Sequence, residues 1–479
     1  MTDLTDEAIR GCALPGADLA AAAEATRRVV GADPAAALSG EDADALVRLA
    51  AHYGAHPFTP LEDVRALLDV DRERFAGLLD TFGRVPQLRD AVLAGPGGKY
   101  WSNTVLSMER KGVIDNVLHR EVVYPHIVAL YPGPTCMFRC HFCVRVTGAR
   151  YAASELDNGN AMFSALIDEM PTENPYVMYI SGGLEPLTNP GLGTLVSRAA
   201  NRGFKLTLYS NSFALTEQTL KRQPGLWDLD AIRTSVYGLT DDEYEATTGK
   251  RGFERVKANL LRFQKERAAR KSPIRLGMSY IVLPGRARRL LDLLDYIVEL
   301  DAAAPDRPIE FLNLREDYSG RPDGKLDPGE REELRETLEL FHEQAALKAP
   351  YLQVDYGYAL QGLRGGVDTE LIRIRPDQMR PEAHIQAGVQ IDLLGDVYLY
   401  RESGFPGLKG AKRYIAGKVS PEKRLIDVVR EHVDTRAGVS AVDGDEYFLD
   451  GFDQVLTARM NQVEADVAAG WEKWRGLMR

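Results

Sequence analysis

Three cysteines, Cys136, Cys140 and Cys143, lie within one short stretch of the chain. Their spacing lets three thiolates converge on a single loop, and thiolates are the usual ligands of a [4Fe–4S] cluster, which normally has four of them. With only three, one iron would be open to another molecule. The alternative is a zinc site completed by His141, although structural zinc sites usually pair their ligands and the sequence has no second cysteine pair.

The cysteine loop follows a strand-like segment at 126–131, the first of a series of alternating strand and helix patterns. Six β–α units predict a parallel sheet with helices outside it. In α/β barrels the chemistry gathers at the carboxyl ends of the strands, which is where the cysteine loop would lie. The other strands are predicted at 176–180, 205–209, 231–237, 275–283 and 309–314, and helices near 160–170, 190–202, 214–222, 253–270, 287–302 and 328–346.

The pattern Cys-x3-Cys-x-aromatic-Cys after a first strand resembles that of the radical S-adenosylmethionine (SAM) enzymes. The resemblance implies an α/β fold, a partial (β/α)6 barrel of the TIM type, and two cofactors, a [4Fe–4S] cluster and SAM as cosubstrate. In that family SAM binds the open iron through its amino and carboxylate groups, and its cleavage gives a 5′-deoxyadenosyl radical. Phe142 stands where the family's aromatic residue packs on adenine.

Three strand ends resemble the family's SAM-binding segments. Ser181-Gly-Gly-Leu-Glu185 is similar to its Gly-Gly-Glu segment, although Leu184 is an insertion, and a plain turn is the alternative. The segment after the third strand is similar to the one that contacts ribose, although small polar residues are also common in loops. The resemblance implies a SAM site formed by Phe142, Gly182, Gly183, Glu185, Ser210, Asn211 and Ser235, the last near the methionine carboxylate.

Two further segments are candidates for binding a substrate. Arginines at the start of a helix, together with its free backbone N–H groups, can bind a phosphate, and Arg286, Arg288 and Arg289 have this arrangement; a solvated basic helix end is the alternative. The sixth strand ends in polar residues suited to gripping sugar hydroxyls or moving protons, unless they form salt bridges with one another. These candidate catalytic residues are Asn313, Arg315, Glu316 and Asp317.

The domain organisation is predicted as three parts. Residues 1–125 read as a helical N-terminal domain, 126–346 as the partial barrel, and 347–479 as a mixed α+β C-terminal extension. A hairpin at 389–400 in the extension resembles that of the auxiliary-cluster domain found after many such barrels. No cysteine follows Cys143, so the extension lacks auxiliary-cluster cysteines.

Composition excludes several classes of protein. The net charge of −11 argues against nucleic acid as a partner, because phosphate backbones need basic surfaces. No apolar run is long enough to span a membrane, and the acidic N-terminus does not resemble a signal peptide. We therefore expect a cytoplasmic protein with no membrane partner. Cys12 is the one cysteine outside the motif.

Within the radical SAM family, the whole chain resembles the deaminases (ammonia-lyases) that act on TDP-sugars in macrolide antibiotic biosynthesis. The resemblance implies removal of hydrogen from C3 of the sugar, loss of ammonia from C4, and a one-electron reductant such as flavodoxin or ferredoxin. Dehydrogenation of a sugar or aminocyclitol alcohol is the alternative. Two other classes of protein are disfavoured. A methylthiotransferase would need a second cluster, for which the sequence has no cysteines, and in a non-enzymatic electron carrier the predicted SAM-binding segments would have no function.

Overall fold

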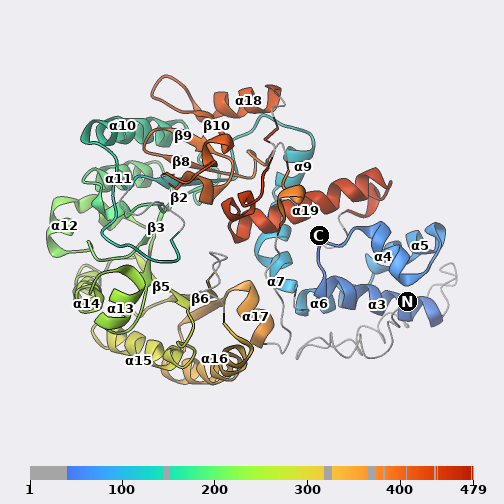
Figure 1. Ribbon diagram of the computed structural model, residues 1–479, viewed down its shortest axis with the longest axis horizontal. Coiled ribbons are helices and arrows are strands. Elements are labelled where there is room, and N and C mark those ends of the chain that lie inside the picture. Colours follow the sequence, from blue (N-terminus) through green and yellow to red (C-terminus); the bar gives the residue numbers. More distant parts are fainter. Residues whose placement is uncertain are drawn as a thin grey trace. The chain divides into compact units, whose positions relative to one another are not determined.

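The computed structural model describes residues 40–95, 97–143, 150–317, 326–364, 374–380, 383–405, 407–435, 438–439, 441–475 and 477. They fall into two compact units (Figure 1). The first unit comprises residues 1–115, 361–380 and 451–479, and the second comprises 116–360 and 381–450. The sequence-based boundaries at 125 and 347 stay predictions. Cys12 lies outside the described residues.

The described elements of the first unit are helical. A buried ion pair joins two of them, since Arg459 Nη2 lies 2.9 Å from Glu109 Oε1 and their side chains are 4% and 2% exposed. Burying both charges is tolerable because each has its partner. The elements are α3 (Gly40–Ala55), α4 (Leu61–Leu68), α5 (Arg72–Phe82), α6 (Pro86–Ala94), α7 (Gly98–Tyr100), a π-helical turn (Trp101–Val105), α8 (Leu106–Arg110) and α19 (Gly451–Ala468), with short 3₁₀ turns at Pro376–Gln378 and Glu472–Trp474.

The second unit is built on one sheet of ten strands in the order β10-β9-β8-β1-β2-β3-β4-β5-β6-β7. Strands β1 to β7 pair in parallel with their neighbours, so the predicted six-unit parallel sheet is confirmed. A seventh strand, β7, was not predicted. The bounds are β1 (Ile127–Tyr131), β2 (Met178–Ile180), β3 (Thr207–Ser210), β4 (Ala231–Val236), β5 (Arg275–Val282), β6 (Phe311–Glu316), β7 (Gln353–Tyr356), β8 (Gly388–Asp392), β9 (Asp396–Tyr398) and β10 (Ile415–Lys418).

Helices follow one another around the outer side of this sheet (Figure 1). Their apolar faces cover strand residues such as Leu312 and Leu314, which have no exposed surface. Alternate residues of the same strands point to the inner face and are only half-buried. The outer helices are α10 (Ala153–Glu169), α11 (Leu192–Asn201), α12 (Glu217–Arg222), α13 (Asp241–Thr248), α14 (Phe253–Ala269), α15 (Arg289–Ala302) and α16 (Pro328–Lys348).

The predicted hairpin is part of this sheet. Strands β8 and β9 pair antiparallel, as expected, but β8 also pairs in parallel with β1 along all five of its residues, with Val128 opposite Val389. Every residue of β8 is buried, which is typical of a central strand. The hairpin therefore extends the barrel sheet beyond β1, and the 3₁₀ turn after it, η6 (Arg401–Gly404), belongs to the same unit. The other described α-helices are α9 (Val113–Leu118), α17 (Tyr358–Arg364) and α18 (Leu425–Thr435).

Among the described residues, no helix is both long enough and apolar enough to cross a membrane.

Candidate functional site

The cysteine loop leaves the carboxyl end of β1 and is fastened to the end of β2. The Glu185 amide donates to the Thr135 carbonyl at 2.9 Å, and the Asn189 side chain donates to the Pro132 carbonyl at 2.9 Å. The backbones come so close that a Cβ on Gly133 would lie 2.8 Å from the Glu185 carbonyl carbon. Only glycine fits there, so the segment that precedes Cys136 has a fixed position.

The middle of the loop is fastened to the end of α13. The Arg139 and His141 amides donate to the carbonyls of Thr248 and Thr247 at 2.7 and 3.1 Å. Gly249 then ends the helix with φ +69°, a left-handed conformation that favours glycine. The loop is thus held at its start by the end of β2 and in its middle by the end of α13.

The three cysteine side chains are half-buried, and the Cys136 sulfur accepts two N–H groups. The Phe138 amide lies 3.5 Å from it and the Asn211 side-chain nitrogen 3.8 Å from it. Such donors stabilise a thiolate and tune the potential of a bound cluster. In the part of the chain that the structure describes, no three His, Cys, Asp or Glu side chains converge on one metal ion. Each thiolate of a cubane cluster binds a different iron, so such convergence is not needed. The donor set of the loop, three cysteine thiols with N–H donors to Cys136, fits a [4Fe–4S] cluster.

Glu185 is a buried carboxylate that joins the ends of β2 and β3. It accepts hydrogen bonds from Ser210 Oγ at 2.6 Å, the Asn211 amide at 2.9 Å and the Leu187 amide at 3.1 Å. Burial raises its pKa, while these hydrogen bonds oppose the rise. Three of the predicted SAM residues, Glu185, Ser210 and Asn211, are therefore brought together with Cys136, and Gly182 and Gly183 begin the same segment.

Aromatic rings surround the cysteine loop. Phe142 lies 5.9 Å from Tyr237, with the two rings tilted by 31°, and the buried Phe138 packs against Phe213 and Tyr237. The Tyr237 pKa is raised by burial and by the nearby Cys140 and Cys136, while a hydrogen bond with Ser235 lowers it. Phe142 and Ser235, both predicted SAM residues, thus flank Tyr237, which the sequence interpretation did not single out.

Polar residues form a layer across the inner face of the sheet. Ser235, Ser279, Asn313 and Asp355 lie opposite one another on β4, β5, β6 and β7. The Asn313 side chain donates to Asp355 at 2.6 Å, and Ser279 Oγ donates to Asn313 Oδ1 at 3.5 Å. One layer closer to the strands' amino ends, the guanidinium of Arg233 lies between the rings of Tyr209 and Phe311, at 4.9 and 5.4 Å. The predicted substrate residue Asn313 is therefore part of an inward-facing polar surface.

A second polar group gathers where β1, β2 and β6 end. Arg401 of η6 donates to the Tyr179 hydroxyl at 3.1 Å and to Asp450 at 2.5 Å. Burial raises the pKa of the neighbouring Glu402, and the positive charge of Arg315 on β6 opposes this rise. The pKa of Tyr131 on β1 is raised first by burial and then by the negative charge of Glu402. Four strands separate β1 from β6 in the sheet, and the electrostatic effects that link Glu402 to residues of both strands agree with a sheet that curves as in a partial barrel.

The remaining rim residues have partners of their own. Glu316 lies 3.7 Å from Arg331. The predicted phosphate-binding arginines also bind protein groups: Arg286 donates to the Tyr237 carbonyl at 2.7 Å and to Thr247 Oγ1 at 2.9 Å. Arg288 pairs with Glu333, and Arg289 with Glu243 and Asp292. The phosphate site stays a prediction, as does the role of Asp317, which directly follows β6.

Two arginine variants separate the structural role from the phosphate role. Arg286→Ala removes donors to the β4 end and to α13, so it should lower the melting temperature, whereas the exposed Arg288→Ala should leave the melting temperature unchanged. Thermal unfolding together with the KM for substrate tests both roles. A raised KM in Arg288→Ala at unchanged stability would support the phosphate site, and an unchanged melting temperature in Arg286→Ala would contradict its structural role.

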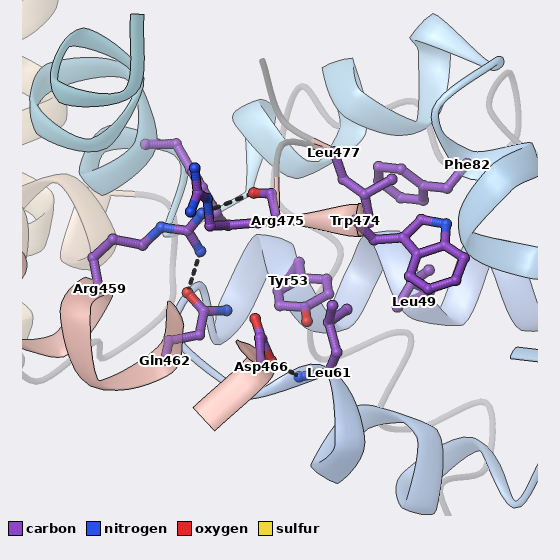
Figure 2. Close-up of a pocket in the computed structure, with 11 residues that line it drawn as sticks. Leu49, Tyr53, Leu61, Phe82, Arg459, Gln462, Asp466, Trp474, Arg475 and Leu477 are labelled. Atoms are coloured by element: carbon purple, nitrogen blue, oxygen red, sulfur yellow. Dashed lines mark hydrogen bonds between the residues drawn. The ribbon is translucent and has the colours of Figure 1, made fainter. Parts of the chain in front are cut away.

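A pocket in the helical unit contains none of the predicted site residues (Figure 2). Asp466 accepts the Leu61 amide at 2.7 Å, and Arg459 donates to Gln462 at 2.6 Å and to the Arg475 carbonyl at 2.9 Å. Because these polar groups bond to one another, the pocket has the character of packing between α3, α4 and α19 rather than of a reactive site.

The sequence comparisons agree with this geometry. The model of the "Radical SAM superfamily" matches residues 130–296, which run from β1 into α15. Over 471 residues, the chain is 61% identical to the dTDP-4-amino-4,6-dideoxy-D-glucose ammonia-lyase of Streptomyces venezuelae, covering 98% of this chain and 97% of that protein. The chain belongs to the radical SAM superfamily. As a radical SAM protein it is an enzyme that uses a [4Fe–4S] cluster and SAM, and the zinc alternative is not retained.

Among solved structures, the radical SAM protein is similar to Streptococcus suis SuiB bound to S-adenosylmethionine, with a TM-score of 0.46 and 14% identity, covering 77% of this chain and 73% of that chain. It is also similar to native anSMEcpe with bound AdoMet, with a TM-score of 0.44 and 14% identity, covering 74% of this chain and 100% of that chain.

Several inward-facing residues of this radical SAM enzyme were missed from the sequence. Arg233 and Tyr237 each lie two residues from Ser235 along a predicted strand. The two-residue period of a strand therefore places all three on the same face. Asp355 belongs to the strand that was not predicted. Arg401, Glu402 and Asp450 reach the barrel through pairing of β8 with β1, a long-range contact that has no local sequence signal.

Proposed function

We propose that this enzyme is a radical SAM ammonia-lyase that converts dTDP-4-amino-4,6-dideoxy-D-glucose to dTDP-3-keto-4,6-dideoxy-D-glucose and ammonia, in desosamine biosynthesis. The observation that carries this proposal is the 61% identity to an ammonia-lyase of that substrate along 98% of the chain. Such extended similarity includes the residues around η6 as well as the cysteine loop. The polar inner face of the barrel supports a sugar as substrate.

Each part of the site has a task in this reaction. Cys136, Cys140 and Cys143 would hold the cluster, and the segments that contain Glu185 and Asn211 would hold SAM beside it. When bound, the cluster and SAM supply a carbon-centred radical that removes one hydrogen atom from the sugar. The protein's own contribution is to position C3 of the sugar at the carboxyl ends of the strands and to exclude water from the reactive centre.

The polar layer of Ser279, Asn313 and Asp355 offers donors and acceptors for sugar hydroxyls. In the polar group around η6, the carboxylate of Glu402 complements the protonated C4 amine, whereas Asp450 is already paired with Arg401. The inner face therefore combines hydroxyl-binding and ammonium-binding groups, which is what a 4-amino sugar requires.

Besides the electron that cleavage of SAM consumes, the sugar itself requires one further external electron. Hydrogen removal leaves a radical at C3. Loss of the C3 hydroxyl proton and of ammonia from C4 then moves the unpaired electron to C4, beside the new ketone. One electron and one proton convert C4 to a methylene group. Radical SAM enzymes need a reductant, and we propose flavodoxin or ferredoxin as the one-electron donor.

The test is anaerobic turnover with the reconstituted enzyme, SAM, a reductant and the amino sugar deuterated at C3. We expect substrate-dependent 5′-deoxyadenosine that contains deuterium, with ammonia and the 3-keto sugar formed in equal amounts. A keto sugar that retains the amine would instead identify a dehydrogenase. No substrate-dependent 5′-deoxyadenosine would reject this substrate.

A further inference from the structure

Glu402 is a half-buried carboxylate for which the described part of the chain offers no side-chain hydrogen-bond or salt-bridge partner. Its neighbours in the polar group are paired: Asp450 accepts from Arg401 at 2.5 Å, and Arg401 also donates to Tyr179. Among the described residues, no side-chain hydrogen bond or salt bridge of Glu402 is found, although it lies on a turn that is half-buried in the barrel. A buried charge is normally paired, so an unpaired carboxylate at this place is suited to a ligand.

The turn that carries Glu402 is held firmly. Ser403 and Gly404 are buried, and Ser403 Oγ donates to the Tyr400 carbonyl at 2.5 Å. A Cβ on Gly404 would lie within 1.7 Å of the side chain of Gln390, a fully buried residue of β8. The turn is therefore pressed against the central part of the sheet, and Glu402 is presented from a rigid support, as an acid–base group requires.

Charged groups face Glu402 from several elements. Asp450, in the segment before α19, repels its negative charge, while Arg315 of β6 and Arg401 of η6 attract it. Tyr131 at the end of β1 is also within electrostatic reach. Burial is the largest influence and, with these charges, raises the pKa of Glu402 to about 7. A group with such a pKa can both take and return a proton near neutral pH.

We propose that Glu402 is the acid–base residue of the deamination, which accepts the C3 hydroxyl proton of the sugar radical and returns it to the departing ammonia. The proposal rests on the function proposed above and adds a residue and a role to it. The C4 ammonium supplies the positive partner that Glu402 lacks, so the same carboxylate also orients the amine.

The proton transfer explains why nitrogen leaves. Once hydrogen has been removed from C3, Glu402 takes the proton of the C3 hydroxyl. The C4–N bond then breaks with its electron pair on nitrogen, C3 becomes a carbonyl carbon, and the unpaired electron resides on C4. Ammonia leaves neutral and receives the proton from Glu402 as ammonium. The carboxylate is restored, and neither atoms nor electrons are gained or lost in this step.

The other inner carboxylates are less suited to the role. Asp450 is bound by Arg401, and Asp355 accepts from Asn313, while Glu316 lies near Arg331. A carboxylate held by a cation is a weaker base, because the cation favours its charged form. Glu185 is fully occupied by three donors.

The experiment compares Glu402→Gln with the wild-type holoenzyme, using the C3-deuterated sugar. We expect unchanged cluster content and hydrogen removal within about threefold of wild type, but ammonia formation slower by about 100-fold or more, as for loss of a general base. The sugar radical should consequently accumulate, giving a larger electron paramagnetic resonance signal than in wild type. The control is Glu431→Gln on the exposed face of α18, which should behave as wild type.

The pH profile gives a second readout. Because the carboxylate form is the base, wild-type ammonia formation should rise as pH increases through about 7 and then level off. Glu402→Gln should lose this rise, and Glu402→Asp should keep it at a lower rate. If Glu402→Gln does not fold, the Glu402→Asp profile decides: a profile without the rise would overturn the proposal.

Two other results would also overturn the acid–base role. One is wild-type ammonia formation in Glu402→Gln, and the other is an equal loss of hydrogen removal and ammonia formation, which would indicate binding alone. Either result leaves the proposed function intact as long as the wild-type enzyme deaminates the sugar. Failure of the wild-type enzyme to do so would reject the function itself.

Discussion

Cys140→Ala should abolish cluster assembly and, with it, all SAM cleavage. The structure holds the loop around Cys140 by backbone hydrogen bonds from Arg139 and His141 to the end of α13, so removing one sulfur leaves the loop in place and takes away only a ligand. A cluster with two protein thiolates would lack half of its usual ligand set. Iron and sulfide analysis, the visible absorption spectrum and 5′-deoxyadenosine formation measure the effect.

The matched control is Cys12→Ala, which removes the one cysteine outside the motif. This variant should retain full iron content and full activity. If Cys140→Ala retained iron and cleaved SAM at the wild-type rate, the assignment of the three cysteines as ligands would be wrong.

Local patterns were sufficient to predict the barrel. The six predicted parallel strands are present, because alternating apolar segments and amphipathic helices follow from residues that are neighbours in sequence. The cysteine loop and the Gly-Gly and Ser-Asn segments were placed at strand ends for the same reason. Their convergence near Cys136 then follows from the parallel topology, since all these ends lie at one edge of the sheet.

Features that depend on distant pairing were not predictable in this way. The four-residue β7 carries a short pattern, and its identity as a strand depends on pairing with β6. The pairing of β8 with β1 brings Arg401, Glu402 and Asp450 to the barrel, and nothing in their local sequence indicates it. The hydrogen bonds of Glu185 were equally unpredictable, because its carboxylate meets the end of β3 only in the folded protein.

Glu185→Ala should destabilise the second unit and weaken SAM binding while leaving the cluster in place. Without the carboxylate, Ser210 Oγ and the amides of Asn211 and Leu187 lose their acceptor, at a cost of about 1–3 kcal/mol for each buried donor. The Asn211 side chain, which points at Cys136, would then lose the support of its backbone. We therefore expect a lower melting temperature, an unchanged iron content and a higher Kd for SAM.

The comparison with Glu185→Gln tests whether hydrogen bonding or charge is responsible. The glutamine amide retains one acceptor oxygen but presents an N–H group toward a backbone donor. Glu185→Gln should therefore change the melting temperature and the Kd for SAM in the same direction as Glu185→Ala, but by less. Glu155→Ala is the matched control, because that partly exposed carboxylate accepts a single amide at the start of α10 and its loss should leave SAM binding unchanged. A Glu185→Ala enzyme with wild-type stability and wild-type affinity for SAM would contradict a structural role for the hydrogen bonds to Glu185. Loss of SAM affinity at wild-type stability would instead assign Glu185 to direct contact with SAM.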